Sequence, residues 1–91
     1  MVIEWSLRAQ SDLERIVADI SRHSPAGAKR VLDRIRKRVD DLNQFSAQGV
    51  ARPRHVYRLD IARTPYFALY RISSDKIVIL KVIHGRRNRR S

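Results

Sequence analysis

Apolar residues recur at helical spacing through the first half of the chain. A short strand is expected first, from Val2 to Trp5. Ser6 then predicts an N-cap, because its hydroxyl can accept a free backbone N–H of the first helical turn. The apolar stripe that follows steps by three and four residues and comprises Leu13, Ile16, Val17 and Ile20. The solvent side of this helix is assigned to Arg8, Asp12, Arg15, Asp19 and Arg22.

Ser24 and Pro25 predict the start of a second helix. Serine suits the N-cap, and proline suits the first helical position, where the missing N–H forms no intrahelical bond anyway. Because only His23 and Ser24 separate the two patterns, the helices are expected to form an antiparallel hairpin. The second apolar stripe comprises Ala28, Val31, Leu32, Ile35, Val39 and Leu42.

The second half of the chain changes to patterns typical of strands. The segment from Asn43 to Pro53 carries turn-forming residues and is predicted to be a loop. Strands are expected from His55 to Ile61, from Tyr66 to Ile72 and from Lys76 to His84. The last of these is almost wholly apolar, as a central strand would be.

The order of elements predicts an α+β fold, β-αα-βββ, in which the helical hairpin packs on one face of an antiparallel sheet. The length suits one domain, residues 1–91. The hairpin residues expected to be buried against the sheet are Leu13, Ile16, Ile20, Val31, Leu32, Ile35 and Val39. The last strand is expected to supply the facing layer with either Val78, Leu80 and Val82 or Ile77, Ile79 and Ile83. A last strand buried on both sides would use both sets.

Composition narrows the class of protein. The chain has no cysteine, so neither a disulfide framework nor a cysteine metal site is expected. No cluster of metal ligands and no phosphate-binding glycine motif stands in the sequence, and we predict neither metal nor cofactor. The N-terminus does not read as a secretory signal, and no apolar run is long enough to cross a bilayer. These features predict a cytoplasmic protein that does not bind membranes.

The net charge of +11 is placed unevenly. Residues 1–42 hold 9 Lys+Arg and 7 Asp+Glu, a balance of +2, whereas residues 43–91 hold 11 and 2, a balance of +9. A field of this kind attracts polyanions or an acidic protein and speeds their encounter. A small DNA-binding module is one possibility, but the hairpin is expected to cover the sheet and leaves no free recognition helix.

Several short motifs occur in a particular order along the chain. The opening strand ends at Trp5 and is followed by A-x-x-DL at Ala9, Asp12 and Leu13. Then come PAGAKRVLDRI from Pro25, PYxxxYRI from Pro65 to Ile72, and HGRR from His84 to Arg87. As an ordered set, these motifs resemble the RelE/ParE superfamily of bacterial toxins. The HGRR exit points to the ParE branch.

The resemblance implies one of two activities. RelE-type toxins cut messenger RNA on the ribosome and need cations and a proton-handling group around the scissile phosphate. ParE-type toxins keep the fold, lack that set and poison DNA gyrase. Aligned with the RelE pattern, Arg58 and Arg87 match two of its cations. Asp60 reverses the sign of a third, Phe67 replaces an arginine, and the tail offers no tyrosine.

We therefore predict a ParE-like toxin of a type II toxin–antitoxin module, a non-enzymatic protein that inhibits DNA gyrase and so DNA replication, in the manner of plasmid-stabilisation systems. The resemblance implies a ParD-like antitoxin with an acidic C-terminal region. The residues expected to contact antitoxin or target are Arg58, Arg71, Arg86, Arg87, Arg89 and Arg90. The alternative is a RelE-like ribonuclease that acts on ribosome and mRNA, with Arg58, His84 and Arg87 as its catalytic residues.

Overall fold

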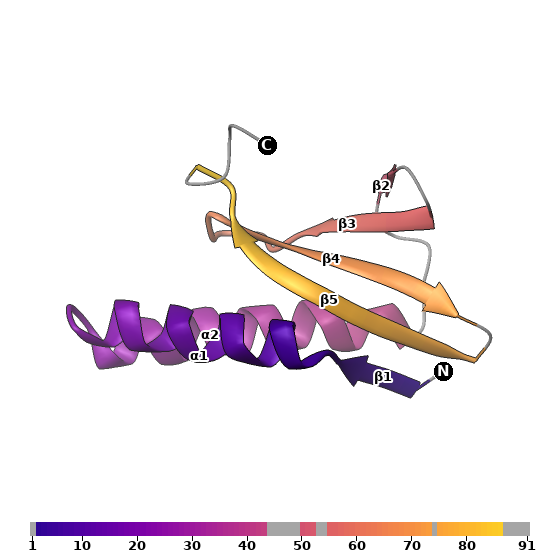
Figure 1. Cartoon of the computed structure of the whole chain (residues 1–91). Coiled ribbons are helices and arrows are strands. Elements are labelled where there is room, and N and C mark those ends of the chain that lie inside the picture. Colours follow the sequence, from indigo (N-terminus) through magenta and orange to yellow (C-terminus); the bar gives the residue numbers. More distant parts are fainter. Residues whose placement is uncertain (1, 44–49, 53–54, 74, 87–91) are drawn as a thin grey trace.

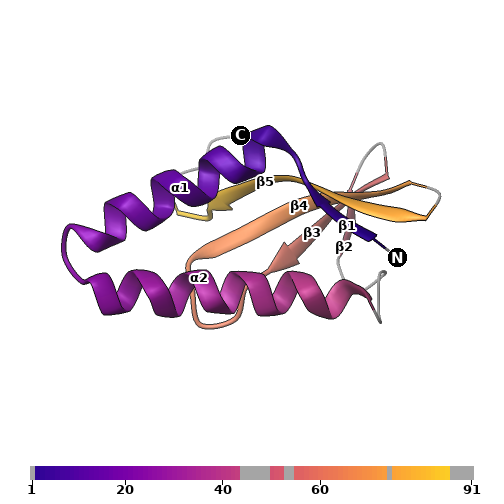
Figure 2. The ribbon, with the colours of Figure 1, turned by 90° about the horizontal axis from the view of Figure 1, so that it is seen from below.

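Two helices lie side by side on one face of a five-stranded sheet (Figures 1 and 2). The computed structural model describes residues 2–43, 50–52, 55–73 and 75–86. The elements in chain order are β1 (Val2–Trp5), α1 (Leu7–Ser21), α2 (Pro25–Asp40), a 3₁₀ turn (Asp41–Asn43), β2 (Val50–Arg52), β3 (Val56–Asp60), β4 (Tyr66–Ser73) and β5 (Lys76–His84).

Both helices begin at the residues that the sequence indicates. The Ser6 hydroxyl accepts the Ala9 N–H at 3.0 Å, and the Ser24 hydroxyl accepts the Gly27 N–H at 2.9 Å. Pro25 occupies the first turn of α2. Each cap supplies an acceptor to an N–H that has no carbonyl partner within its helix. The predicted helical hairpin is confirmed.

The α+β class is also confirmed, and three details of the sheet differ from expectation. The strand order is β1-β5-β4-β3-β2, and β1 pairs with β5 in parallel, so the sheet is mixed rather than antiparallel throughout. The expected loop from Asn43 to Pro53 contains β2, which pairs with β3. His55 precedes β3 in a left-handed conformation, with φ of 60°, so the strand begins at Val56.

A β-bulge in β5 decides which side chains face the core. Leu69 pairs with Lys81 and Tyr70 with Ile79, so Leu80 is an extra residue on β5. The extra residue reverses the alternation of side chains beyond it. Ile77, Ile79 and Val82 are consequently buried, and neither of the two alternating sets expected from the sequence is correct.

Asp12 is buried, contrary to its assignment to the solvent side of α1. Its side chain has 0% exposure. Its Oδ2 accepts the backbone N–H of Val82 at 2.9 Å. Its Oδ1 accepts Arg8 Nε at 3.1 Å and Arg15 Nη2 at 2.7 Å. A buried carboxylate needs such partners to offset its loss of hydration, and here they join α1 to the edge of β5.

Ser6 makes a second connection between the start of α1 and the same edge. Its N–H donates to the Ile79 carbonyl at 3.0 Å, and its hydroxyl donates to the Leu80 carbonyl at 2.9 Å. Strand β1 pairs with β5 only as far as Ile79. Beyond that point, α1 supplies hydrogen-bond partners in place of a neighbouring strand.

The hairpin contributes less of its apolar stripe to the core than the sequence predicts. Ile16, Ile35 and Val39 are buried, and Leu13, Ile20 and Val31 pack partly buried against them. Leu32 is half-buried, does not belong to this core, and lines a groove between α1 and α2 together with Leu13 and Val17.

Ile35 and Leu32 differ in burial, and this difference gives a stability test. Ile35 is fully buried, so Ile35→Ala should lower the free energy of unfolding by about 2–5 kcal/mol. Leu32→Ala serves as the matched control and should cost clearly less, because its site is open to solvent. Urea denaturation measures both, and a Leu32→Ala loss equal to that of Ile35→Ala would contradict the described core.

Candidate functional site

The sheet face away from the helices presents cationic and apolar side chains in rows. We call it the open face. Paired residues of neighbouring strands share a face, and alternate residues along a strand switch faces. Three rows therefore lie on it: Val56, Arg71 and Val78; Arg58, Leu69 and Lys81; and Asp60, Phe67 and Ile83. The apolar members other than Phe67 are half-buried, and Arg71 is exposed.

Arg58 and Phe67 form the most closely packed part of the open face. The guanidinium carbon of Arg58 lies 3.8 Å from the centroid of the Phe67 ring, within the range of a cation–π interaction. Phe67 is only 7% exposed, although it lies on the face opposite the helices. Phe67, at the position where the RelE pattern has an arginine, therefore acts as a platform for Arg58.

Asp60 binds the same guanidinium. Its Oδ1 lies 3.0 Å from both Nε and Nη2 of Arg58. The pair is largely exposed, at 39% and 71% of the two side chains, so it adds little stability. Its consequence is electrostatic, because the negative charge of Asp60 offsets the positive charge of Arg58 locally.

Gly85 allows the chain to leave β5 close to Pro65. Its N–H donates to the Pro65 carbonyl at 2.7 Å, and a Cβ at this position would lie 3.2 Å from that oxygen. A larger residue would force the two segments apart. A hollow at this end of the open face is lined by Arg58, Arg63, Thr64, Pro65, Gly85 and Arg86.

His84 lies on the opposite face of the sheet from Arg58. It pairs with Tyr66, whose ring faces the helices and meets the imidazole edge-on at a centroid distance of 5.2 Å. The Nδ1 of His84 accepts the backbone N–H of Arg86 at 3.2 Å. The structure therefore does not bring Arg58 and His84 of the alternative catalytic set to one point. Arg87, Arg89 and Arg90 lie outside the described residues.

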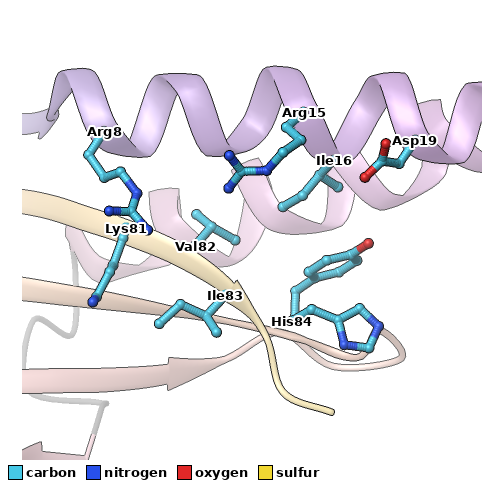
Figure 3. A pocket seen from close by; sticks show the side chains of 9 residues that line it. Arg8, Arg15, Ile16, Asp19, Lys81, Val82, Ile83 and His84 are labelled. Atoms are coloured by element: carbon cyan, nitrogen blue, oxygen red, sulfur yellow. The ribbon is translucent and has the colours of Figure 1, made fainter. Parts of the chain in front are cut away.

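A second cleft lies between α1 and the end of β5, with a volume of about 230 Å³ (Figure 3). Arg8, Arg15 and Asp19 line it from α1, and His84 lines it from β5. The two arginines are tied to Asp12 beneath them. Helical periodicity places Asp12 with the charged residues on the solvent side of α1. Its place in the A-x-x-DL motif is the one sequence signal that distinguishes it from them.

Within the described residues, no three potential metal-binding side chains of His, Asp or Glu come together. Neither described helix is long and apolar enough to cross a bilayer.

Comparison with known protein families identifies the family of the chain. Residues 3–89 match the family model described as the ParE toxin of the type II toxin–antitoxin system parDE. The chain belongs to the ParE toxin family. It is 40% identical over 84 residues to a protein of Sinorhizobium fredii named "Putative toxin Y4kP", a match that covers 91% of this chain and 86% of that protein.

Solved structures of toxin–antitoxin systems share the fold. A chain of the chromosomal ParDE system from P. aeruginosa superposes with a TM-score of 0.80 at 28% identity, covering 92% of this chain and 95% of the other. A chain of the RelBE2 toxin–antitoxin complex from Mycobacterium tuberculosis gives 0.62 at 22% identity, covering 91% and 95%. The chain is thus a type II toxin of the RelE/ParE superfamily.

Proposed function

We propose that this ParE-family toxin inhibits DNA gyrase by protein contact and does not cleave RNA. The observation that carries the proposal is the state of Arg58. Its guanidinium is held by Asp60 at 3.0 Å and by the ring of Phe67 at 3.8 Å. A cation placed in this way is poorly suited to grip a phosphate, because an anion already lies against it.

Phosphoryl chemistry on RNA requires several fixed cations and a proton-handling group around one phosphate. On the open face, Asp60 would repel that phosphate. His84, the histidine of the alternative catalytic set, is on the helix-facing side of the sheet, paired with Tyr66. A substrate held by Arg58 would therefore lie across the sheet from that imidazole.

The family relationship supports the same choice. The matching family model describes the toxin of parDE, and a structure from a ParDE system aligns at 28% identity over nearly the whole chain. The likeness to the RelBE2 chain, at 22% identity, concerns the fold alone.

One observation favours the alternative ribonuclease. The hollow at the end of the open face collects three arginines, Arg58, Arg63 and Arg86, beside Gly85. Such a hollow could accept a phosphate if Asp60 moved away from Arg58. The ribosome and mRNA therefore remain the competing target, and the experiment below separates the two activities.

We further propose that the partner is a ParD-like antitoxin whose acidic, amphipathic segment covers the open face. Half-buried apolar residues there alternate with cations, as in the row of Val56, Arg71 and Val78. An amphipathic segment could bury the apolar positions and pair its carboxylates with Arg71 and Arg86. Apolar surface of this kind, interspersed with charge, is typical of a protein interface.

The target of the toxin can be tested with His84→Ala. We expect the wild-type chain to inhibit supercoiling by purified gyrase and to leave mRNA intact on a programmed ribosome. The variant should inhibit gyrase nearly as well, because His84 contacts Tyr66 on the helix-facing side. His23→Ala, in the exposed turn between the helices, is the matched control.

The opposite outcome is equally clear. If His84 were a general acid or base, its loss would lower RNA cleavage by roughly 10²-fold or more. Codon-dependent cleavage that disappears in His84→Ala but not in His23→Ala, together with unimpaired gyrase, would reject the gyrase proposal and favour the ribonuclease.

The antitoxin interface predicts a salt-dependent association rate. Complementary charge accelerates encounter, and salt screens it. Arg71→Gln/Arg86→Gln should slow association with the antitoxin in stopped-flow measurements. Arg22→Gln/Arg30→Gln removes the same charge from the hairpin and should change the rate much less. An association rate independent of salt, or an antitoxin segment that is net basic, would argue against this interface.

A further inference from the structure

A second basic surface runs along α2 and continues onto the turn between β3 and β4. We call it the α2 ridge, and it consists of Arg30, Arg34, Lys37, Arg38 and Arg63. The four residues on α2 are spaced by four, three and one positions, which places them on one side of the helix. The turn between β3 and β4 passes close to α2 on the same side of the molecule (Figure 2).

The ridge is held together although its members carry the same charge. Arg34 Nη1 donates to the backbone carbonyl of Arg63, and Arg38 Nε donates to that of Asp60, each at 3.4 Å. Arg63 has a left-handed backbone with φ of 65°, a conformation that costs free energy for a residue other than glycine. These features hold the turn beside α2, and they add the guanidinium of Arg63 to the α2 ridge.

The charge of the ridge is only weakly offset. In the described ranges, no ion pair joins an acidic side chain to Arg30, Arg34, Lys37 or Arg63. A shallow hollow along the ridge is lined by Arg34, Lys37, Arg38, Asp41, Ala62 and Arg63, in which Asp41 is the sole acid. Stabilisation of the helix dipole accounts for cations in the last turn, Lys37 and Arg38, but not for those further from the helix end.

We propose that the α2 ridge binds the phosphate backbone of a nucleic-acid duplex, without regard to its sequence. Arg30 and Arg38 are eight positions apart, which is about 12 Å along the helix axis. Over that length one strand of a duplex presents about three or four phosphates, a number comparable to the cations on α2. The side of α2 that packs on the sheet is not needed for contact with phosphates. The helix can therefore cover the sheet with one side and bind a duplex with the other.

The chemistry of the ridge favours a duplex over a protein or a single strand. A protein partner would need apolar anchors, and the large apolar residues that the described chain exposes, Val2 and Leu7, lie in β1 and at the start of α1. Single strands are bound through stacking on aromatic side chains, and none of the residues lining the hollow is aromatic. The ridge shares Arg63 with the hollow at the end of the open face, but its other four cations lie on α2. The inference therefore does not depend on the target of the toxin.

Fluorescence anisotropy with a labelled duplex of mixed sequence tests the proposal. The full chain should bind with a Kd of about 10⁻⁴–10⁻⁶ M near physiological salt, and more tightly at lower salt. Arg30→Gln/Lys37→Gln removes two exposed cations whose side chains form no hydrogen bond or ion pair within the described residues. At 0.1 M salt it should weaken binding by roughly 10- to 100-fold and make the slope of log affinity against log salt shallower by about two.

Two comparisons keep the test specific. Arg22→Gln/Arg71→Gln removes the same charge from the hairpin tip and the open face, and it should leave affinity close to that of the wild type. Arg63→Lys should bind nearly as well as the wild type, whereas Arg63→Gly, which accepts the positive φ without strain, should bind less tightly. Circular dichroism confirms that each variant is folded.

The outcomes separate cleanly. Equal losses in the ridge and control variants would show that only net charge matters, and unchanged binding in the ridge variant would place the contact elsewhere. Either result overturns the proposal, as does a preference for a single strand over the duplex. If the ridge instead bound an acidic protein, the wild-type chain would bind the antitoxin through the ridge and would not bind the duplex. Arg30→Gln/Lys37→Gln would then lose binding to the antitoxin.

Discussion

The buried carboxylate of Asp12 fixes the position of α1 on the sheet. It accepts the N–H of Val82 through one oxygen and is neutralised by Arg8 and Arg15 through the other. On the side of β5 away from β4, the pairing with β1 ends at Ile79. A helix side chain thus fills the role of an edge strand at this point, and removing it would leave both a buried N–H and two unbalanced cations.

The same region of β5 determines which side chains can act together. The bulge at Leu80 reverses the alternation, so Ile83 faces the open side with Phe67, and His84 faces the helices with Tyr66. Without the extra residue, continued alternation from Ile79 would place His84 on the open face, the face of Arg58. The bulge therefore separates a cation from an imidazole that a ribonuclease would need together, and it is a structural basis for preferring a binding toxin.

Charge on the molecule is divided between two surfaces with different chemistry. The open face mixes cations with half-buried apolar residues, as a protein partner requires. The α2 ridge carries cations, and Ala62 is the one apolar residue among those lining its hollow, which suits a phosphate backbone better than an apolar partner. The excess of positive charge in the second half of the sequence indicated the open face. It did not indicate the α2 ridge, because four of the five ridge cations lie in the first half, whose net charge is low.

Local signals in the sequence predicted the elements well, because caps, proline and apolar periodicity act over a few residues. Ser6, Ser24 and Pro25 mark the helix starts, and the strand ending at His84 has the expected bounds. The burial of Asp12 could not be read from periodicity, since its partner Val82 is 70 residues away. The parallel pairing of β1 and the bulge at Leu80 likewise arise from tertiary contacts.

The same limits apply to the candidate site. The alignment with the RelE pattern singled out Arg58, Asp60 and Phe67, and the structure shows Arg58 in contact with the other two. It gave no indication that His84 lies on the other side of the sheet. Faces of a strand follow from residue parity only where the strand is regular, and one extra residue is enough to reverse the assignment.

Amide hydrogen exchange at Val82 tests the role of Asp12 most directly. In the wild-type chain, the Val82 N–H should be as strongly protected as that of Ile79 in the centre of the sheet. Asp12→Asn keeps an acceptor and should retain much of this protection. Asp12→Ala should accelerate exchange at Val82 by roughly 10- to 100-fold, as expected for an unsatisfied buried donor. Rapid exchange at Val82 in the wild type, or no difference between the two variants, would contradict the account.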